Sequence, residues 1–154
     1  MKYYSRLSFF IVVMAFTGVQ AFAQIQKPVT WNFTAKKLSA TSYELHLTAT
    51  LQEGWHIYSQ STPDGGPVAT NITFNKNALV IIKGKPTETG KMETKHEPLF
   101  GVDVKQFANK VDFVQVIQLK AAVKTNVSGI IESMACNDTQ CLPPAKQSFS
   151  ISIQ

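Results

Sequence analysis

The sequence has few of the residues that build the common kinds of catalytic site. It contains only two cysteines, and it has no glycine-rich phosphate loop, no paired-carboxylate arrangement and no Ser/His/Asp set. Two thiolates do not supply the four ligands that zinc prefers, and His46, His56 and His96 have no ligand spacing with them, so we expect neither a metal nor another cofactor. The lysines are scattered rather than gathered in a basic stripe, which argues against nucleic-acid binding.

Long apolar runs are also missing after the N-terminus, where none approaches the ~20 residues of a membrane span. The N-terminus itself has the three parts of a secretory signal: a positive start (Lys2, Arg6), an apolar core (Leu7–Val19) and small residues before the cleavage point (Ala21-Phe22-Ala23). We therefore expect a signal peptide at residues 1–23 and one exported domain at residues 24–154. The expected product is soluble in the periplasm and does not insert into the membrane after cleavage.

Helical periodicity is weak nearly everywhere, whereas strand patterns are frequent. Apolar and polar residues alternate for nine positions over Tyr43–Leu51, the period of a strand with one buried face. Further strands are expected at Trp31–Ala35, Trp55–Tyr58, Asn71–Phe74, Leu79–Ile82, Lys110–Leu119, Val127–Met134 and Phe149–Ile153. One turn of helix is expected within Asp103–Lys110. Seven to nine short strands separated by turn signals predict an all-β fold, an immunoglobulin-like antiparallel β-sandwich with a single domain.

The two cysteines lie together near the C-terminus, in the stretch Cys136-Asn137-Asp138-Thr139-Gln140-Cys141-Leu142-Pro143-Pro144. Exported chains meet an oxidising compartment in which such a pair forms a disulfide. Asn137-Asp138 favours a turn, and prolines cannot donate to a strand ladder, so we expect the pair at a sheet end or across a tight loop.

This cysteine pair has three possible interpretations on the residues alone. As a staple it is weak, because closing so short a ring contributes only about 2 kcal/mol. As a redox site it is plausible, because disulfides constrained by a tight loop are often the more reducible ones. A cysteine-only metal site is the third, and the shortage of ligands noted above disfavours it. The choice between staple and redox centre stays open at this point.

Three stretches make the chain resemble a known family, the periplasmic N-terminal domain of the thiol:disulfide interchange protein DsbD. They are an aromatic strand at Gly54–Ser59, the loop Pro63-Asp64-Gly65-Gly66-Pro67 followed by Thr70 and Phe74, and the segment from Ala135 to Pro144. The resemblance covers about Trp31 to Phe149. It implies an immunoglobulin-like sandwich whose cysteine pair alternates between dithiol and disulfide.

The resemblance also implies roles for individual residues. Cys141 matches the cysteine that forms mixed disulfides, and Cys136 matches the one that resolves them. A cap loop over the pair is expected at Glu97-Pro98-Leu99-Phe100-Gly101, and either Leu99 or Phe100 shields the sulfurs. Tyr58 and Trp55 either line the site or belong to the core. For His56, a surface position on a strand is favoured over a role as proton carrier.

Two functional hypotheses follow. In the first, the chain is a thiol–disulfide exchange relay, a component of a protein-disulfide reductase system. It accepts electrons from a thioredoxin-like or membrane partner and passes them to oxidised envelope thiol proteins. Because the full reductase continues into further domains after this one, we expect the relay to work with separate proteins. In the second, the chain is a non-catalytic binding module with a structural disulfide. The oligomeric state is not predicted.

Overall fold

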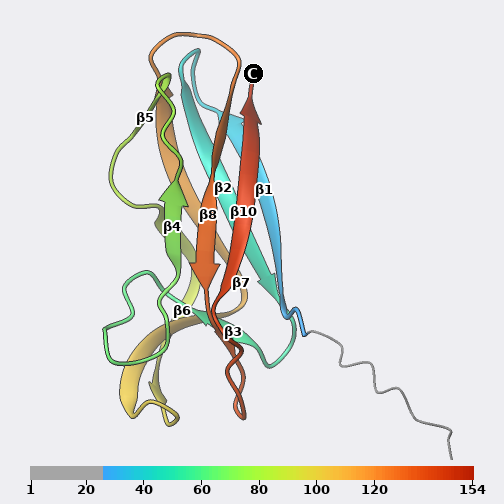
Figure 1. Cartoon of the computed structure of the whole chain (residues 1–154), viewed down its shortest axis with the longest axis vertical. Coiled ribbons are helices and arrows are strands. Elements are labelled where there is room, and N and C mark those ends of the chain that lie inside the picture. Colours follow the sequence, from blue (N-terminus) through green and yellow to red (C-terminus); the bar gives the residue numbers. More distant parts are fainter. Residues whose placement is uncertain (1–25) are drawn as a thin grey trace, which may run out of the picture.

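The computed structural model describes residues 26–154, and the predicted signal segment, residues 1–23, lies outside this part of the chain. Every regular element in the described residues is a β-strand, and the strands form two packed antiparallel sheets (Figure 1). The larger sheet contains β1 (Val29–Lys37), β2 (Ser42–Leu51), β3 (His56–Tyr58), β5 (Val80–Ile82), β6 (Thr87–Glu97), β7 (Val102–Leu119) and β9 (Ala135–Cys136). The smaller sheet contains β4 (Asn71–Phe74), β8 (Thr125–Ser133) and β10 (Ala145–Ile153).

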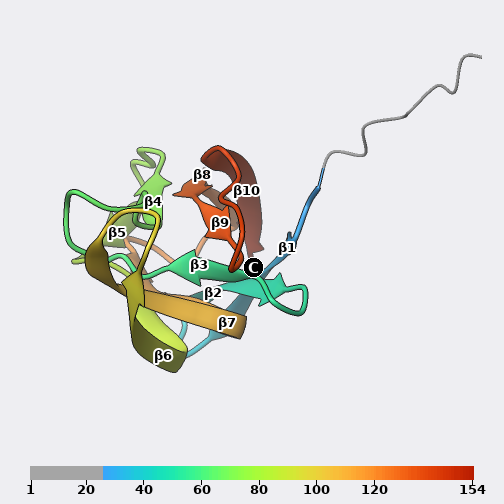
Figure 2. The same ribbon diagram turned by 90° about the horizontal axis from the view of Figure 1, so that it is seen from below.

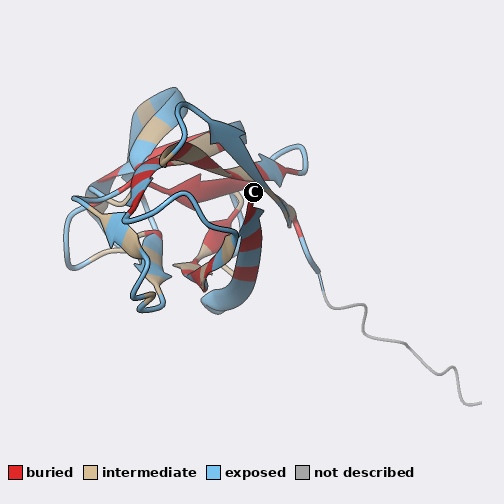
Figure 3. Cartoon of the chain, turned by 90° about the horizontal axis from the view of Figure 1, so that it is seen from above, coloured by how far each residue is buried: buried red, intermediate tan, exposed pale blue. Residues whose placement is uncertain are grey.

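The predicted alternation of β2 is confirmed, and it builds one wall of the core. Its buried positions are Tyr43, Leu45, Leu47, Ala49 and Leu51. Opposite them, the smaller sheet contributes Val127, Ile131, Phe149 and Ile151. The Phe149 ring lies 5.5 Å from the rings of both Phe33 and Phe74, so it joins the edge of one sheet to the other. Figure 3 shows the buried residues concentrated between the sheets and the exposed ones outside.

The long strand β7 changes partner near its middle, and this change creates the region that holds the cysteines. Its pairing with β3 ends at Ala108, and its pairing with β2 begins at Lys110. Between them, Asn109 has a φ of 63°, a left-handed conformation that asparagine tolerates better than most residues. The register of β6 against β7 shifts at the same level, between Gly90 and Met92. Such a bulge bends a strand and re-aims the residues beyond it.

Two expectations about this region are wrong. The helical turn within Asp103–Lys110 does not form, because strands pair with this segment on both sides and override its weak helical preference. Strand β6 was not expected, since only one of its eleven residues, Glu97, is buried and no apolar alternation marks it.

Candidate active site

The cysteine hairpin lies at the end of the molecule where β6 turns into β7 (Figures 1 and 2). Cys136 ends β9, and Cys141 pairs with it through an isolated bridge with their Cα atoms 4.0 Å apart. The two sulfurs form a disulfide. Asn137 shapes the turn between them, because its side-chain oxygen accepts hydrogen bonds from the backbone N–H groups of Thr139 (3.0 Å) and Gln140 (2.9 Å). A local turn of this kind holds the two cysteines opposite each other.

The two cysteines differ in burial. Cys136 is fully buried, at 0% exposure, whereas Cys141 is only half-buried. Around them lies a small apolar cluster, separate from the main core, that contains Tyr58, Val102, Val104 and Met134. A thiolate must reach a sulfur in order to attack it, so Cys141 is the more accessible end of the bond.

Strand β3 supplies the polar side chains next to the disulfide. His56 pairs directly with Cys136 on β9, and partners in an antiparallel pair project to the same face of the sheet. Tyr58, two residues further on, projects to that face too and joins the cysteine cluster. Ile57 points to the opposite face and belongs to the main core. The alternation of one short strand therefore separates the site from the core.

His56, Tyr58 and Glu97 form a buried hydrogen-bonded chain. The Tyr58 hydroxyl donates to the Glu97 carboxylate at 3.0 Å, and because it has only one proton it accepts from Nε2 of His56 at 3.1 Å. His56 and Glu97 are each 7% exposed, and Nε2 lies 3.7 Å from the carboxylate. His56 and Tyr58 come from β3 and Glu97 ends β6, so the chain of bonds ties β3 to the turn between β6 and β7.

Burial governs how these groups titrate. It lowers the pKa of His56 below 6.5, because the buried site disfavours the imidazolium, and this effect outweighs the attraction of the nearby Glu97 carboxylate. Lys95 also lowers this pKa, and Asp138 raises it. Burial and the bond to Glu97 raise the pKa of Tyr58 well above its usual value. At neutral pH the histidine is therefore neutral and the tyrosine keeps its proton.

The predicted cap loop, residues 97–101, is the turn that joins β6 to β7. The N–H groups of Phe100 and Gly101 donate to the Glu97 carbonyl at 3.1 Å and 2.8 Å, and Gly101 has a φ of 69°, which glycine adopts without strain. Leu99 is 57% exposed and Phe100 is 37% exposed. A recess of about 380 Å³ separates this loop from the cysteine turn, and Leu99, His56 and Asn137 are among its lining residues, whereas Phe100 is not.

The structure thus brings together most of the residues expected at the site, but not all of them. Cys136, Cys141 and Tyr58 share one cluster, Glu97 bonds to Tyr58, and Leu99 lies across the recess. Trp55, by contrast, packs in the main core. The favoured surface position of His56 is wrong, since that residue is buried. The spacing of His56 and Tyr58 was the available signal, because residues two apart on a strand share a face.

Two kinds of feature are not found within residues 26–154. No three or more His, Cys, Asp and Glu side chains gather there as a metal site would require. No helix able to cross a membrane is present in the same part of the chain.

Two packed antiparallel sheets with a disulfide hairpin at one end define an immunoglobulin-like β-sandwich with a thiol–disulfide site. Residues 23–153 match the family model for the N-terminal domain of the thiol:disulfide interchange protein DsbD, and the chain belongs to this family. Family membership together with the disulfide-forming pair supports a role in thiol–disulfide exchange. No curated protein sequence matches the chain.

Solved structures share the fold at low sequence identity. The reduced N-terminal domain of Neisseria meningitidis DsbD is 16% identical, with a TM-score of 0.53 over 81% of this chain and 85% of that one. The N-terminal periplasmic domain of ScsB from Proteus mirabilis is 20% identical with a TM-score of 0.53 over 83% of this chain, but this match covers only 47% of that chain. A complex of the DsbD and PilB N-terminal domains from N. meningitidis gives 14% identity and a TM-score of 0.51, covering 82% and 87% of the two chains.

Proposed function

We propose that the chain is an exported thiol–disulfide exchange relay that works through Cys136 and Cys141. It accepts electrons from a thioredoxin-like or membrane partner and reduces the disulfides of envelope client proteins. In this proposal residues 1–23 direct export to the periplasm and residues 24–154 form the working domain. The ScsB neighbour is a periplasmic domain, which agrees with this location.

The observation that carries the proposal is the unequal burial of the two cysteines. Cys136 is fully buried and Cys141 is half-buried, so Cys141 is the residue that an incoming thiolate reaches more easily. A disulfide serving only as a staple needs no such difference. It would also contribute little, because the ring is short and the main core is formed by other residues.

The relay runs in two balanced halves. A partner thiolate attacks Sγ of Cys141, the Cys136–Cys141 bond breaks, and Cys136 leaves as a thiolate that takes up a proton. The partner's second thiolate then attacks the partner's first sulfur, which is bonded to Cys141 in the mixed disulfide. Cys141 leaves as a thiolate and takes up the second proton. Two electrons and two protons have moved from the partner to the pair. In the second half, Cys141 attacks a client disulfide, and Cys136 resolves the mixed disulfide and restores the internal bond.

The surroundings of Cys136 favour its thiol over its thiolate, so this sulfur takes up a proton once the disulfide has broken. Burial disfavours the thiolate, and the His56–Tyr58–Glu97 chain lies on the same side of the sheet as this sulfur. We assign these three residues as positioning residues that hold the polar environment of Cys136. Leu99 takes the role of the shielding residue of the cap loop, since it lines the recess beside the cysteine turn and Phe100 does not.

A separate thiol protein is the expected partner. The Neisseria DsbD N-terminal domain is known in a complex with the PilB N-terminal domain, so a relative of this chain docks with another protein domain. We extend to this chain only the class of partner, a protein that exchanges thiols and disulfides.

Trapping of the mixed disulfide tests the relay. A Cys136→Ala variant keeps the attacking thiol and lacks the resolving one, so it is expected to accumulate mixed disulfides with thioredoxin-fold proteins of the envelope. The matched control is Cys141→Ala, which leaves only the buried thiol and is expected to trap far less. Equal trapping by both variants, or none by either, contradicts the proposal and leaves a binding module with a structural disulfide.

A further inference from the structure

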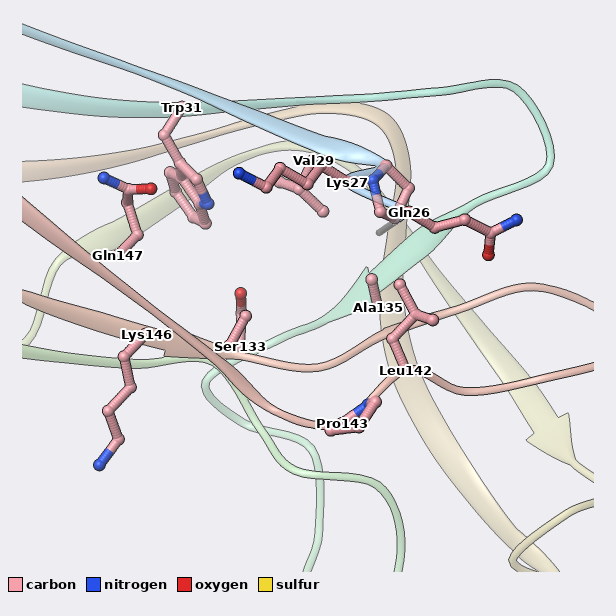
Figure 4. A pocket seen from close by; sticks show the side chains of 12 residues that line it. Gln26, Lys27, Val29, Trp31, Ser133, Ala135, Leu142, Pro143, Lys146 and Gln147 are labelled. Atoms are coloured by element: carbon pink, nitrogen blue, oxygen red, sulfur yellow. The ribbon is translucent and has the colours of Figure 1, made fainter. Parts of the chain in front are cut away.

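A groove of about 540 Å³ lies behind the cysteine hairpin, at the seam between the two sheets (Figure 4). The start of β1 and the start of β10 form its two walls, and Ala135 and Leu142 lie between them. These two residues are the chain neighbours of Cys136 and Cys141. The groove therefore adjoins the redox hairpin from the side opposite the His56–Tyr58–Glu97 chain.

Both walls of the groove are free strand edges. Strand β1 pairs only with β2, and β10 pairs only with β8, so within residues 26–154 one edge of each has no partner strand. Proteins commonly protect such edges with lysine. Lys36 and Lys37 do so at the far end of β1, but Val29 and Trp31, the β1 residues that line the groove, are uncharged. An extended peptide can add to an edge of this kind through its backbone.

The lining fits an apolar side chain accompanied by a polar backbone. Val29, Trp31, Leu142 and Pro143 are among the apolar residues that line it. Ser133 is only 6% exposed as a residue, and its hydroxyl points into the groove (Figure 4). A peptide carbonyl or N–H placed in the groove can form a hydrogen bond with this hydroxyl.

The charge at the rim favours an acidic occupant. Lys27 lines the groove, no acidic residue does, and within the described residues Lys27 forms no ion pair. Lys146 also lies at the rim, but it points away from the groove and its ammonium is 3.7 Å from the Glu132 carboxylate (Figure 4). Lys27 therefore supplies the charge that an incoming segment meets.

We propose that this groove binds an extended segment of the thiol protein that exchanges with Cys141, and that the segment carries an apolar anchor flanked by acidic residues. The inference rests on the proposed relay, because it names how the partner docks. Docking here holds the partner against Leu142, the residue next to the cysteine under attack. The groove thus sets affinity for protein partners, while the sulfur chemistry itself stays in the hairpin.

The direct test is a titration of the folded chain with a synthetic probe peptide, acetyl-Glu-Val-Phe-Val-Glu-amide, followed by tryptophan fluorescence. Trp31 and Trp55 are the two tryptophans, and Trp55 is buried in the core, so Trp31 reports on the groove. We expect saturable binding that changes the fluorescence of the parent chain, and we expect this fluorescence change to be absent in the Trp31→Phe variant. We also expect weaker binding for the lysine counterpart of the peptide and for a version with N-methylated backbone amides.

Substitutions in the groove sharpen this test. Lys27→Glu is expected to weaken binding of the acidic peptide roughly threefold to tenfold, as when an exposed ion pair becomes a repulsion. Ser133→Val is expected to weaken it as well, and the exposed Lys120→Glu, on the loop after β7, is the matched control without effect. Two results overturn the proposal. In one, decanoate displaces the probe peptide as effectively as another peptide does, which indicates a site for small amphiphiles. In the other, the chain self-associates and a second copy covers the groove.

A second readout separates failure of the groove from failure of the relay. With a protein client, Lys27→Glu is expected to raise KM and leave kcat unchanged. With dithiothreitol, which is too small to use the groove, the rate at which Cys136–Cys141 is reduced is expected to stay the same. If Lys27→Glu and Ser133→Val leave KM for the client unchanged while the disulfide still exchanges, the docking groove is wrong and the relay stands. If the disulfide exchanges with neither reagent, the relay itself is wrong.

Discussion

At the scale of single residues, the site depends on side chains whose surroundings differ from those of their neighbours in sequence. Cys136 and Cys141 form one bond but differ in access, and His56 and Ile57 are adjacent but face opposite sides of a sheet. The sequence was enough to identify the cysteine pair, Tyr58 and Glu97 as candidates. It was not enough to show that His56 is buried, because burial depends on β9 and the β6–β7 turn, which come from distant parts of the chain.

The buried histidine makes folding stability depend on pH. In the unfolded chain His56 takes up a proton near pH 6.5, whereas in the folded chain its pKa is lower. The contribution of His56 to the free energy of unfolding is therefore fully present above pH 6.5 and is lost as the pH drops below that value. We expect urea unfolding between pH 7.5 and pH 5 to show a declining free energy of unfolding that His56→Gln makes shallower. His96→Gln, at an exposed position, is the control. An unchanged slope in His56→Gln argues against burial as the controlling effect.

The tyrosine at the centre of the hydrogen-bonded chain is predicted to matter for both stability and exchange. Tyr58→Phe leaves two buried polar groups without their shared partner and is expected to cost about 1–3 kcal/mol. The matched control is Tyr43→Phe, since Tyr43 is also buried and its hydroxyl donates to the Gln154 carbonyl at 2.6 Å, far from the cysteines. Only Tyr58→Phe should alter the pH dependence of disulfide reduction by dithiothreitol. If both variants change the pH dependence of disulfide reduction to a similar extent, the assignment of Tyr58 as a positioning residue for Cys136 is wrong.

At the scale of elements, the strands with alternating patterns were predictable and the strands at the site were less so. Strand β2 follows its pattern from end to end, because one of its faces packs on the core. Strand β6 was missed because almost all of it is exposed, and β9 because it has two residues. The bulge at Asn109 was also beyond prediction, since it results from β7 pairing with β3 and then with β2.

The cap loop is an element whose role can be measured directly. If Leu99 shields the disulfide, Leu99→Ala is expected to speed the reduction of Cys136–Cys141 by dithiothreitol severalfold, with no change in the free energy of unfolding, because Leu99 is already 57% exposed. Phe100→Ala is the matched control on the same turn and is expected to change the rate less. A larger effect of Phe100→Ala would reverse the assignment.

The smaller sheet contains one position where only glycine fits. A Cβ on Gly129 would collide with the Thr73 carbonyl oxygen and would lie 2.6 Å from Cζ of Phe149. Gly129→Ala is therefore expected to destabilise the fold by about 1–3 kcal/mol through overpacking, as measured by urea unfolding. Gly84→Ala is not a suitable control, because Gly84 has a φ of 72°. Ser128→Ala, at the adjacent position on β8, is a better one. Equal stability of Gly129→Ala and the parent would show that the sheet yields there.

At the scale of the whole molecule, the sandwich and the redox hairpin are nearly independent. The main core joins the two sheets, while the cysteines belong to a separate small cluster beyond the bulge of β7. The fold class was predictable because it depends on the main core alone. The groove between β1 and β10 was not, because it depends on how two strand edges from opposite ends of the chain lie beside each other.

This independence predicts a mild effect of removing the disulfide. The double variant Cys136→Ser, Cys141→Ser is expected to lose only about 2 kcal/mol of stability, the loop entropy of so short a ring, and to keep its β-sheet circular dichroism spectrum. Binding of the probe peptide to the groove is expected to survive. Global unfolding of this variant would show that the bond holds the sandwich together.

A Cys136–Cys141 bond that breaks and re-forms in service must have a reduction potential close to those of its exchange partners. Equilibration of the folded chain with a thioredoxin couple, followed by thiol alkylation, gives the value. We expect a potential in the range of thioredoxin-like exchangers, roughly −200 to −270 mV. A value below about −300 mV, or no reduction while the chain stays folded, contradicts the account and indicates a structural disulfide.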